Sequence, residues 1–195
     1  MKIGVLAVQG AFIEHEHIIE KIGHEVVEIR QRKDLDGIDG IILPGGESTV
    51  QGQLLRKLDM LATIKSLIAD GLPTLATCAG LILLAGHIDN DDSVHIGTLP
   101  VTVKRNAYGR QLGSFVRTAP MKGFDEFPMI FIRAPYISSI KDNVDVLAAV
   151  NDRIVAVQYN NQIGLAFHPE LSGDTRIHEY FISPVSYTHL RAHET

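Results

Sequence analysis

The first 85 residues alternate short apolar runs with segments of helical periodicity, and this alternation limits the fold more than any other feature. Lys2–Val8 is a continuous run rich in branched residues, the pattern of a strand buried on both faces. From Phe12 to Ile22 a helical period places Ile18, Ile19 and Ile22 on one stripe, and Gly23 supplies the stop. Strands that alternate with helices predict a doubly wound, parallel α/β sheet.

The same alternation continues through the next sixty residues. The strands that we expect here are Glu25–Ile29, Gly40–Leu43 and Pro73–Ala76. The helices that we expect are one that starts at Ser48 as its N-cap, one from about Met60 to Ala69, and Ala79–Ala85. These elements add strands and crossover helices to the same sheet.

After Gly86 the pattern changes to consecutive short strands, which predicts an antiparallel extension of the sheet. The expected strands are Leu99–Lys104, Gly113–Arg117, Met129–Ile132, Val144–Val150, Arg153–Tyr159 and Gln162–Phe167. We expect the last of them to rejoin the central sheet, and a final helix to run from about Asp174 to Ile182. The predicted fold is therefore a mostly parallel central sheet flanked by helices, with antiparallel strands added.

Composition excludes several classes of protein. The chain has 195 residues, of which 45% are hydrophobic and 21% charged, as in one globular domain. The net charge is −5 with no basic run, so we expect no nucleic-acid partner. No apolar stretch approaches the roughly 20 residues that span a membrane. Cys78 is the only cysteine, which excludes a disulfide within the chain and indicates a reducing, cytoplasmic location.

The segment around Cys78 has the layout of a nucleophile elbow. A strand enters a turn and then a helix, and small residues, Ala76 and Gly80, lie two positions before and after the cysteine. The helix N-terminus would favour the thiolate of Cys78. A buried cysteine that serves as a small hydrophobic residue is the alternative.

A His-Pro-Glu sequence provides candidates for a general base and its partner. Pro169 pushes His168 towards an extended conformation. Because residues i and i+2 of an extended segment point the same way, Glu170 can orient the imidazole of His168. The preceding strand would deliver both residues to the carboxyl edge of the sheet, where the elbow also lies. A loop histidine beside a solvated carboxylate is the alternative.

The stretch Leu43–Ser48 contains Gly45-Gly46 directly after a strand. Two glycines allow backbone N–H groups to turn towards a developing oxyanion. The amides of Gly46 and Ala79 would be the two donors; a simple strand-to-helix turn is the alternative.

Other candidate sites have weaker patterns. Glu14-His15-Glu16-His17 is interpreted as surface, because positions i and i+2 lie on nearly opposite sides of a helix. The remaining histidines, His178 among them, lack ligand-like spacing, so we expect no metal site. No complete dinucleotide or P-loop motif occurs. The segment Arg105–Gln111 is either an exposed loop or a binding site for a polar substrate with an α-carboxylate.

Six motifs occur together and in order: GVLAVQG, LPGGEST, TCAGLILLA, RNAYGRQ, FIRAP and FHPEL. In this combination the chain resembles the class I glutamine amidotransferases, and within them the glutaminase subunits of pyridoxal 5′-phosphate synthase. The resemblance runs from Met1 to about Ile182. It implies a flavodoxin-like, single glutamine amidotransferase domain over residues 1–183. Residues 184–195 lack apolar periodicity, and we expect them to be a non-native or disordered tail.

The resemblance also implies a mechanism. Cys78 would attack the side-chain amide of L-glutamine, His168 would shuttle protons and Glu170 would orient His168. The implied glutamine-binding residues are Gly46, Glu47, Ser48, Arg105, Ile132 and Arg133. Ammonia would pass to a partner synthase subunit with a (β/α)₈ barrel, for which pyridoxal 5′-phosphate is a product. The chain itself would need no cofactor.

Two departures leave alternatives open. Ala76 stands where the family usually has Gly, and the chain changes character after Ser183, where relatives continue their last helix. One alternative is another Cys-His-Glu hydrolase, such as a γ-glutamyl hydrolase, or the subunit of a different amidotransferase. Another is a module that docks on the synthase but is catalytically weak.

Overall fold

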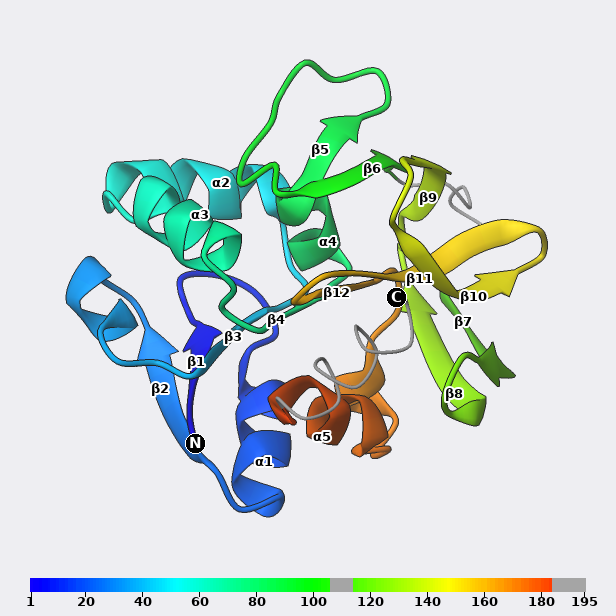
Figure 1. Ribbon diagram of the computed structural model, residues 1–195, viewed down its shortest axis with the longest axis horizontal. Helices are drawn as coiled ribbons and strands as arrows, with labels where there is room; N and C mark the ends of the chain where they lie inside the picture. Colours follow the sequence, from blue (N-terminus) through cyan, green and yellow to red (C-terminus); the bar gives the residue numbers. More distant parts are fainter. Residues whose placement is uncertain (106–113, 184–195) are drawn as a thin grey trace.

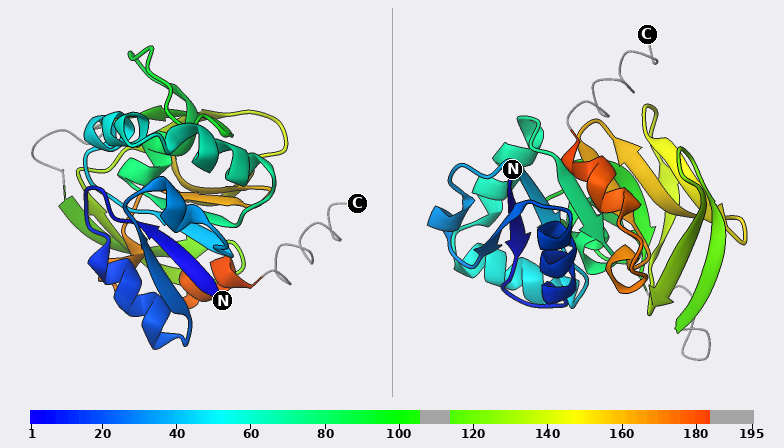
Figure 2. Two further views of the ribbon diagram at one scale, coloured as in Figure 1. Left: turned by 90° about the vertical axis from the view of Figure 1, so that its left-hand side faces the viewer. Right: turned by 90° about the horizontal axis from the view of Figure 1, so that it is seen from below.

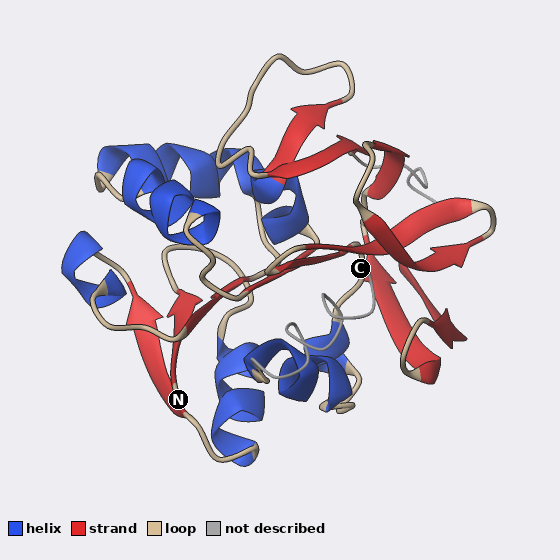
Figure 3. Cartoon of the chain, in the orientation of Figure 1, coloured by secondary structure: helices blue, strands red, loops and turns tan. Residues whose placement is uncertain are grey.

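The computed structural model describes residues 1–105 and 114–183. A long, twisted sheet crosses the molecule, and helices lie on both of its faces in the parallel half (Figures 1 and 3). Most of the RNAYGRQ motif and the expected tail, residues 184–195, lie outside the described residues. Within the described part, no helix is both long and apolar enough to cross a membrane.

The parallel half of the sheet has the strand order β2-β1-β3-β4-β12. The strands are β1 (Lys2–Leu6), β2 (Glu25–Ile29), β3 (Gly40–Leu43), β4 (Thr74–Thr77) and β12 (Gln162–Leu165). All neighbouring pairs are parallel. Every residue of β3, β4 and β12 is buried, as the continuous apolar runs predict. The prediction that the last strand rejoins the central sheet is confirmed, because β12 pairs with β4.

Helices cover this half on both sides. One face carries α1 (Ile13–Lys21) and α5 (Arg176–Ile182), which lie side by side (Figures 1 and 2). The other face carries α2 (Ser48–Lys57), α3 (Leu61–Ala69) and α4 (Ala79–Leu84). Two short 3₁₀ helices, η1 (Arg32–Leu35) and η2 (Pro169–Leu171), complete the helical elements that the structure describes. A single hydrophobic cluster joins the two faces with the sheet.

The rest of the large sheet is mainly antiparallel. Beyond β12 the order continues as β11-β9-β6-β5, and β10 pairs with β11. These strands are β5 (Ala85–Ile88), β6 (Leu99–Lys104), β9 (Tyr136–Ile140), β10 (Asp145–Val150) and β11 (Arg153–Tyr159). A hairpin of β7 (Ser114–Met121) and β8 (Asp125–Ile132) forms a separate two-stranded sheet. The predicted fold class, a mostly parallel sheet with an antiparallel extension, is confirmed.

Several local predictions need correction. Two strands, β5 and β9, were not expected, since Gly86-His87 and Ser138-Ser139 interrupt the apolar pattern. The expected cap of α2 is wrong: Glu47 is the N-cap residue, and Ser48 is the first helical residue. The hydroxyl oxygen of Ser48 instead accepts a hydrogen bond from the guanidinium group of Arg105, which makes Ser48 part of the site described below.

Candidate active site

Cys78 lies on a strained turn between β4 and α4. Its backbone has φ 51° and ψ −104°, a conformation that non-glycine residues rarely adopt. The turn is tight because α4 starts directly against β3, and a β-carbon at Gly80 would lie 2.0 Å from the carbonyl oxygen of Leu43. Ala76, the departure from the usual glycine, is fully buried and pairs regularly with both neighbouring strands. The sheet therefore accommodates the extra methyl group.

His168 and Glu170 form the second part of the site. The backbone N–H of His168 donates to the carbonyl oxygen of Ile130, which ties the end of the β12 segment to the β7–β8 hairpin. His168 Nδ1 lies 2.5 Å from Glu170 Oε1, and both side chains are buried. The expected contact is present, but its geometry differs from the expectation: Glu170 reaches back from the first turn of η2 rather than from an extended segment.

The charges of these groups support one another. Burial alone would lower the pKa of His168, but hydrogen bonds with Cys78 and Glu170 raise this pKa to about 10. Burial alone would raise the pKa of Glu170, but His15 and His168 outweigh burial and lower it. The arrangement therefore favours an imidazolium at His168 beside a carboxylate at Glu170.

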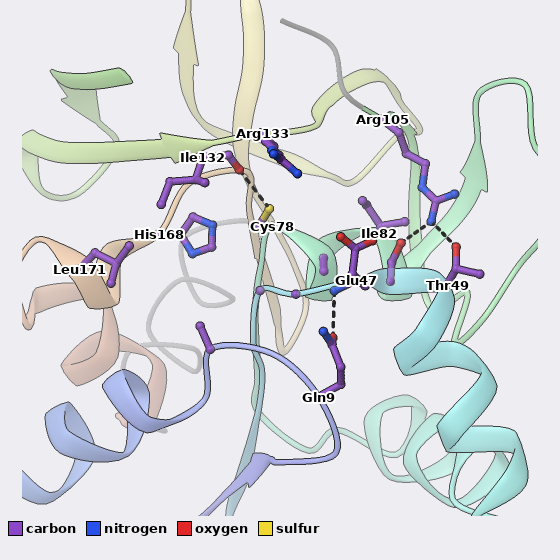
Figure 4. Close-up of a pocket in the computed structure, with 15 residues that line it drawn as sticks. Gln9, Glu47, Thr49, Cys78, Ile82, Arg105, Ile132, Arg133, His168 and Leu171 are labelled. Atoms are coloured by element: carbon purple, nitrogen blue, oxygen red, sulfur yellow. Dashed lines mark hydrogen bonds between the residues drawn. The ribbon is translucent and has the colours of Figure 1, made fainter. Parts of the chain in front are cut away.

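The Gly45-Gly46 turn lies beside His168 and the N-terminal loop. Gly46 has φ +155°, and a β-carbon there would lie 2.5 Å from Gln9 Oε1. Gln9 Oε1 accepts a hydrogen bond of 2.9 Å from the N–H of Glu47 (Figure 4). Ala79, the other expected oxyanion donor, is the first residue of α4, so its N–H has no partner within the helix.

A cavity of about 570 Å³ opens above Cys78 (Figure 4). All six expected glutamine-binding residues line it, together with Cys78, Ala79 and His168. Glu170 does not line it, because this residue lies behind His168. The other lining residues are Gln9, Ala11, Gly45, Thr49, Ile82 and Leu171.

Arg105 closes one side of this cavity. Its guanidinium donates hydrogen bonds to the hydroxyl groups of Ser48 and Thr49 and forms an ion pair of 3.2 Å with Asp91. On the opposite side the carbonyl oxygen of Ile132 accepts a contact of 3.9 Å from Cys78 Sγ. Arg133, with φ 44°, follows at the rim. A cation and several polar groups thus surround the nucleophile candidate.

One sequence interpretation is wrong, and it concerns the site. His15 does not lie on the surface: it is fully buried, and its Nε2 lies 3.4 Å from Glu170 Oε2. The sequence does indicate that His15 is buried, because Ile18, Ile19 and Ile22 follow it at i+3, i+4 and i+7 on the apolar stripe of α1. In the described part of the chain, no cluster of three or more potential ligands is arranged for a metal ion.

Comparison with known proteins agrees with this arrangement. The family model described as the SNO glutamine amidotransferase family matches residues 5–187. The chain belongs to this family. The SNO match covers the elbow, the glycine turn and the His-Pro-Glu segment together.

Two relatives of this SNO-family chain are named "Pyridoxal 5'-phosphate synthase subunit PdxT". The protein from Desulfitobacterium hafniense (strain DSM 10664 / DCB-2) is 58% identical over 187 residues, which are 95% of this chain and 94% of that protein. The protein from Streptococcus pneumoniae (strain ATCC 700669 / Spain 23F-1) is 51% identical and covers 94% of this chain and 97% of its own length.

Solved structures show the same fold. A structure titled "Crystal structure of glutamine amidotransferase" has a TM-score of 0.89 and 38% identity, covering 92% of this chain and 96% of that chain. The structure of PurLQS from Thermotoga maritima has a TM-score of 0.65 at 19% identity, covering 97% of this chain and 98% of that chain. The second likeness concerns the fold alone.

Proposed function

We propose that this chain is the glutaminase subunit of a pyridoxal 5′-phosphate synthase. It hydrolyses L-glutamine to L-glutamate and ammonia, and it passes the ammonia to a partner synthase subunit. The observation that carries the proposal is the row formed by Cys78 and His168 in the wall of the cavity and by Glu170 directly behind His168. The names of the two relatives support the assignment to this synthase.

Cys78 is the nucleophile. Its sulfur attacks the side-chain carbonyl carbon of glutamine, and His168 gives its proton to the departing amide nitrogen, which leaves as ammonia. A thioester remains on Cys78. His168 then takes a proton from water, the resulting hydroxide attacks the thioester, and glutamate leaves as the thiol is restored. Glu170 holds the imidazole of His168 in the required orientation throughout.

The tetrahedral intermediates carry negative charge on the former carbonyl oxygen. The N–H groups of Gly46 and Ala79 are the proposed donors to this oxyanion. The position of Ala79 at the start of α4 supports this role, since an unpaired helical N–H favours an anion. Gly46 supports it through its conformation, which allows the peptide plane to rotate.

The other lining residues recognise the substrate. The guanidinium of Arg105 provides positive charge for the α-carboxylate of glutamine, and Ser48 holds it in place. Glu47 lies on the same rim and provides negative charge for the α-ammonium group. Ile132 and Arg133 close the opposite side of the cavity.

The partner is a synthase subunit with a (β/α)₈ barrel, and both work in the cytoplasm. The names of the relatives support a synthase partner, as does the chemistry of ammonia, which is lost to water unless a second active site receives it. The barrel fold of the partner rests on the family resemblance of the sequence alone, and the cytoplasmic location rests on the single cysteine. Pyridoxal 5′-phosphate is then a product of the complex rather than a cofactor that this chain needs for glutamine hydrolysis.

The test is ammonia release from L-glutamine by the chain together with the synthase. The proposal predicts turnover of glutamine and much slower hydrolysis of γ-glutamyl peptides. Preferential cleavage of γ-glutamyl peptides would indicate a γ-glutamyl hydrolase instead. Binding to the synthase without ammonia release would indicate a docking module.

A further inference from the structure

Two histidines continue the row of polar groups behind Glu170. His15 Nδ1 lies 2.9 Å from His178 Nε2, and His15 Nε2 lies 3.4 Å from Glu170 Oε2. Both histidines are fully buried, His15 on α1 and His178 on α5. These two helices lie on one face of the sheet (Figure 1). The row therefore runs from the nucleophile through His168 and Glu170 to two groups that the mechanism above does not use.

The protons of this row can be assigned from the chemistry of its ends. Glu170 Oε2 is buried and accepts no hydrogen bond from the described residues, so a lone pair of His15 facing it would be repelled. His15 therefore carries its proton on Nε2, where it faces Glu170 Oε2 and the hydroxyl group of Thr77 at 3.3 Å. His15 Nδ1 is then an acceptor, and His178 Nε2–H donates to it.

The far end of the row agrees with this assignment. With its proton on Nε2, His178 presents a bare lone pair at Nδ1, and this buried atom has no hydrogen-bond partner in the described part of the chain. The opposite tautomer would bury an N–H group without an acceptor, which costs more than an unused lone pair on a ring nitrogen.

We propose that His15, held in one tautomer by His178, is a positioning residue that keeps the Glu170 carboxylate oriented towards His168. The inference rests on the proposed function. His15 touches neither the cavity nor the substrate, and it acts through Glu170 alone. With Oε2 directed at His15, Oε1 stays 2.5 Å from His168 Nδ1 and keeps the imidazole aligned with Cys78.

The histidine pair acts by the direction of its N–H groups rather than by net charge. Burial lowers the pKa of His15 most, and His168 lowers it further, while Glu170 and Glu14 oppose this. Burial and His15 lower the pKa of His178 well below its ordinary value. Both rings are therefore neutral at neutral pH, and the positive charge by which His15 lowers the pKa of Glu170 is present only at more acid pH. The groups that face His15 are His178 from α5, Glu170 and His168 from the η2 segment, and Glu14 from its own helix.

Two amide substitutions separate positioning from packing. In His15→Gln the amide nitrogen reaches the place of Nε2 and can still donate towards Glu170, but the acceptor for His178 is lost. In His15→Asn the amide reaches only the place of Nδ1, so the link to His178 can remain while the donor towards Glu170 is lost. Each variant removes one link from the same buried position, so their stabilities serve as mutual controls.

The full-length chain is assayed with its synthase for glutamine turnover. We expect His15→Asn to lower kcat by about 10–100-fold, the usual scale for a positioning partner, with the KM for glutamine unchanged. His15→Gln should stay within a few-fold of wild type. Equal losses in the two variants, or a wild-type kcat in His15→Asn, would overturn the proposal.

A second readout does not require glutaminase activity. Cys78 is the only cysteine, so alkylation of this peptide by iodoacetamide at different pH values reports on its thiolate. In His15→Asn the midpoint of the alkylation profile should move to higher pH, and in His15→Gln it should not. An unmoved midpoint in His15→Asn overturns the positioning role, whereas failure of wild type to hydrolyse glutamine contradicts only the proposed function.

If His15→Asn does not fold, the same comparison of Gln and Asn variants is made at His178. His178→Gln keeps a donor at the place of Nε2, and His178→Asn does not. We expect the Asn variant to lose activity and the Gln variant to keep it. The reverse order, or equal losses at equal stability, contradicts the proposal.

Discussion

The imidazole of His168 packs directly on the backbone of Gly45. A β-carbon at Gly45 would lie 2.4 Å from His168 Cε1 and 3.2 Å from Nδ1, so only glycine allows the ring its position. The glycine turn therefore sets the place of His168, the proposed general base, as well as lining the cavity. This contact gives the first prediction.

Gly45→Ala should displace the His168 ring and lower kcat by about 100-fold, the scale reported for misplacement of a catalytic group by about 1 Å. Overpacking of this kind also costs about 1–3 kcal/mol of stability. The control is Gly86→Ala, where the new β-carbon would meet its nearest atom at an ordinary 3.4 Å. Steady-state glutaminase kinetics and thermal unfolding of both variants check the prediction; equal activities would contradict it.

Cys78→Ala should reduce glutamine hydrolysis to background, because loss of a triad nucleophile lowers kcat by about 10⁶-fold. The substitution removes one sulfur atom from a buried turn, so the fold should remain intact by circular dichroism. An electrophilic glutamine analogue should label wild type at Cys78 and leave the variant unlabelled. Turnover by the variant at a rate near that of wild type would disprove the assignment of the nucleophile.

His168→Asn should lower glutaminase activity far more than Glu170→Gln. In the proposed mechanism His168 transfers the proton, whereas Glu170 only orients the imidazole of His168. In wild type the imidazolium persists above the usual histidine pKa and is lost as the pH rises towards about 10. Glu170→Gln removes a hydrogen-bonded charge that raises this pKa. In Glu170→Gln the fall of the rate at alkaline pH should therefore begin at a lower pH than in wild type. If the fall occurs at the same pH in both proteins, Glu170 does not raise the pKa of His168.

The parallel half of the fold could be predicted from the sequence because its signals are local. β1, β3 and β4 are short apolar runs that end at turns, and each is buried on both faces. The extension could be predicted only in outline. β9 has a single buried residue, Ile137, followed by two exposed serines, and it finds its partners, β6 and β11, through contacts distant in sequence.

The same limit applies to the site. Cys78, His168 and Glu170 could be proposed as site residues because the glycine turn, the cysteine elbow and the His-Pro-Glu segment occur together and in order, although each motif alone is weak. His15 and His178 could not be paired from the sequence, since 163 residues separate them. Each nevertheless occupies the apolar stripe of its helix; in α5, Phe181 and Ile182 follow His178 at i+3 and i+4. A histidine at a core position of an amphipathic helix is the signal that sequence analysis should weigh.

Arg105→Lys should raise the KM for glutamine by about 10–100-fold with little change in kcat, because the single nitrogen of lysine cannot hold Asp91 on one side and Ser48 and Thr49 on the other, as Nη1 and Nη2 of Arg105 do. The control is Arg32→Lys. Arg32 pairs with Asp59 at an exposed position away from the cavity, and the loss of one such pair should change neither constant. A kcat effect larger than the KM effect would instead place Arg105 in the chemical step.

The last prediction concerns Gly46 and the coupling to the synthase. A glutaminase that worked alone would release its ammonia to water, so we expect the isolated chain to be feebly active. Gly46 offers a place for the control, because its peptide plane can rotate its N–H towards or away from the oxyanion. One such donor is worth about 10²–10³ in rate, enough to act as a gate without moving Cys78 or His168.

Gly46→Val should abolish most of the rise in kcat that the synthase produces. A β-carbon at Gly46 would lie 2.5 Å from Gln9 Oε1 and 2.9 Å from the Cα of Gly10, so the turn would lose its freedom to rotate. Gly23→Val is the matched control, since Gly23 also has a positive φ but no atom within 4 Å of a new β-carbon. It carries the same kind of backbone strain without touching the site. The measurement is glutaminase kinetics of each protein with and without the synthase. Full activity of the isolated wild-type chain, or normal activation of Gly46→Val by the synthase, would disprove control through Gly46. Neither result would affect the assignment of Cys78 as the nucleophile.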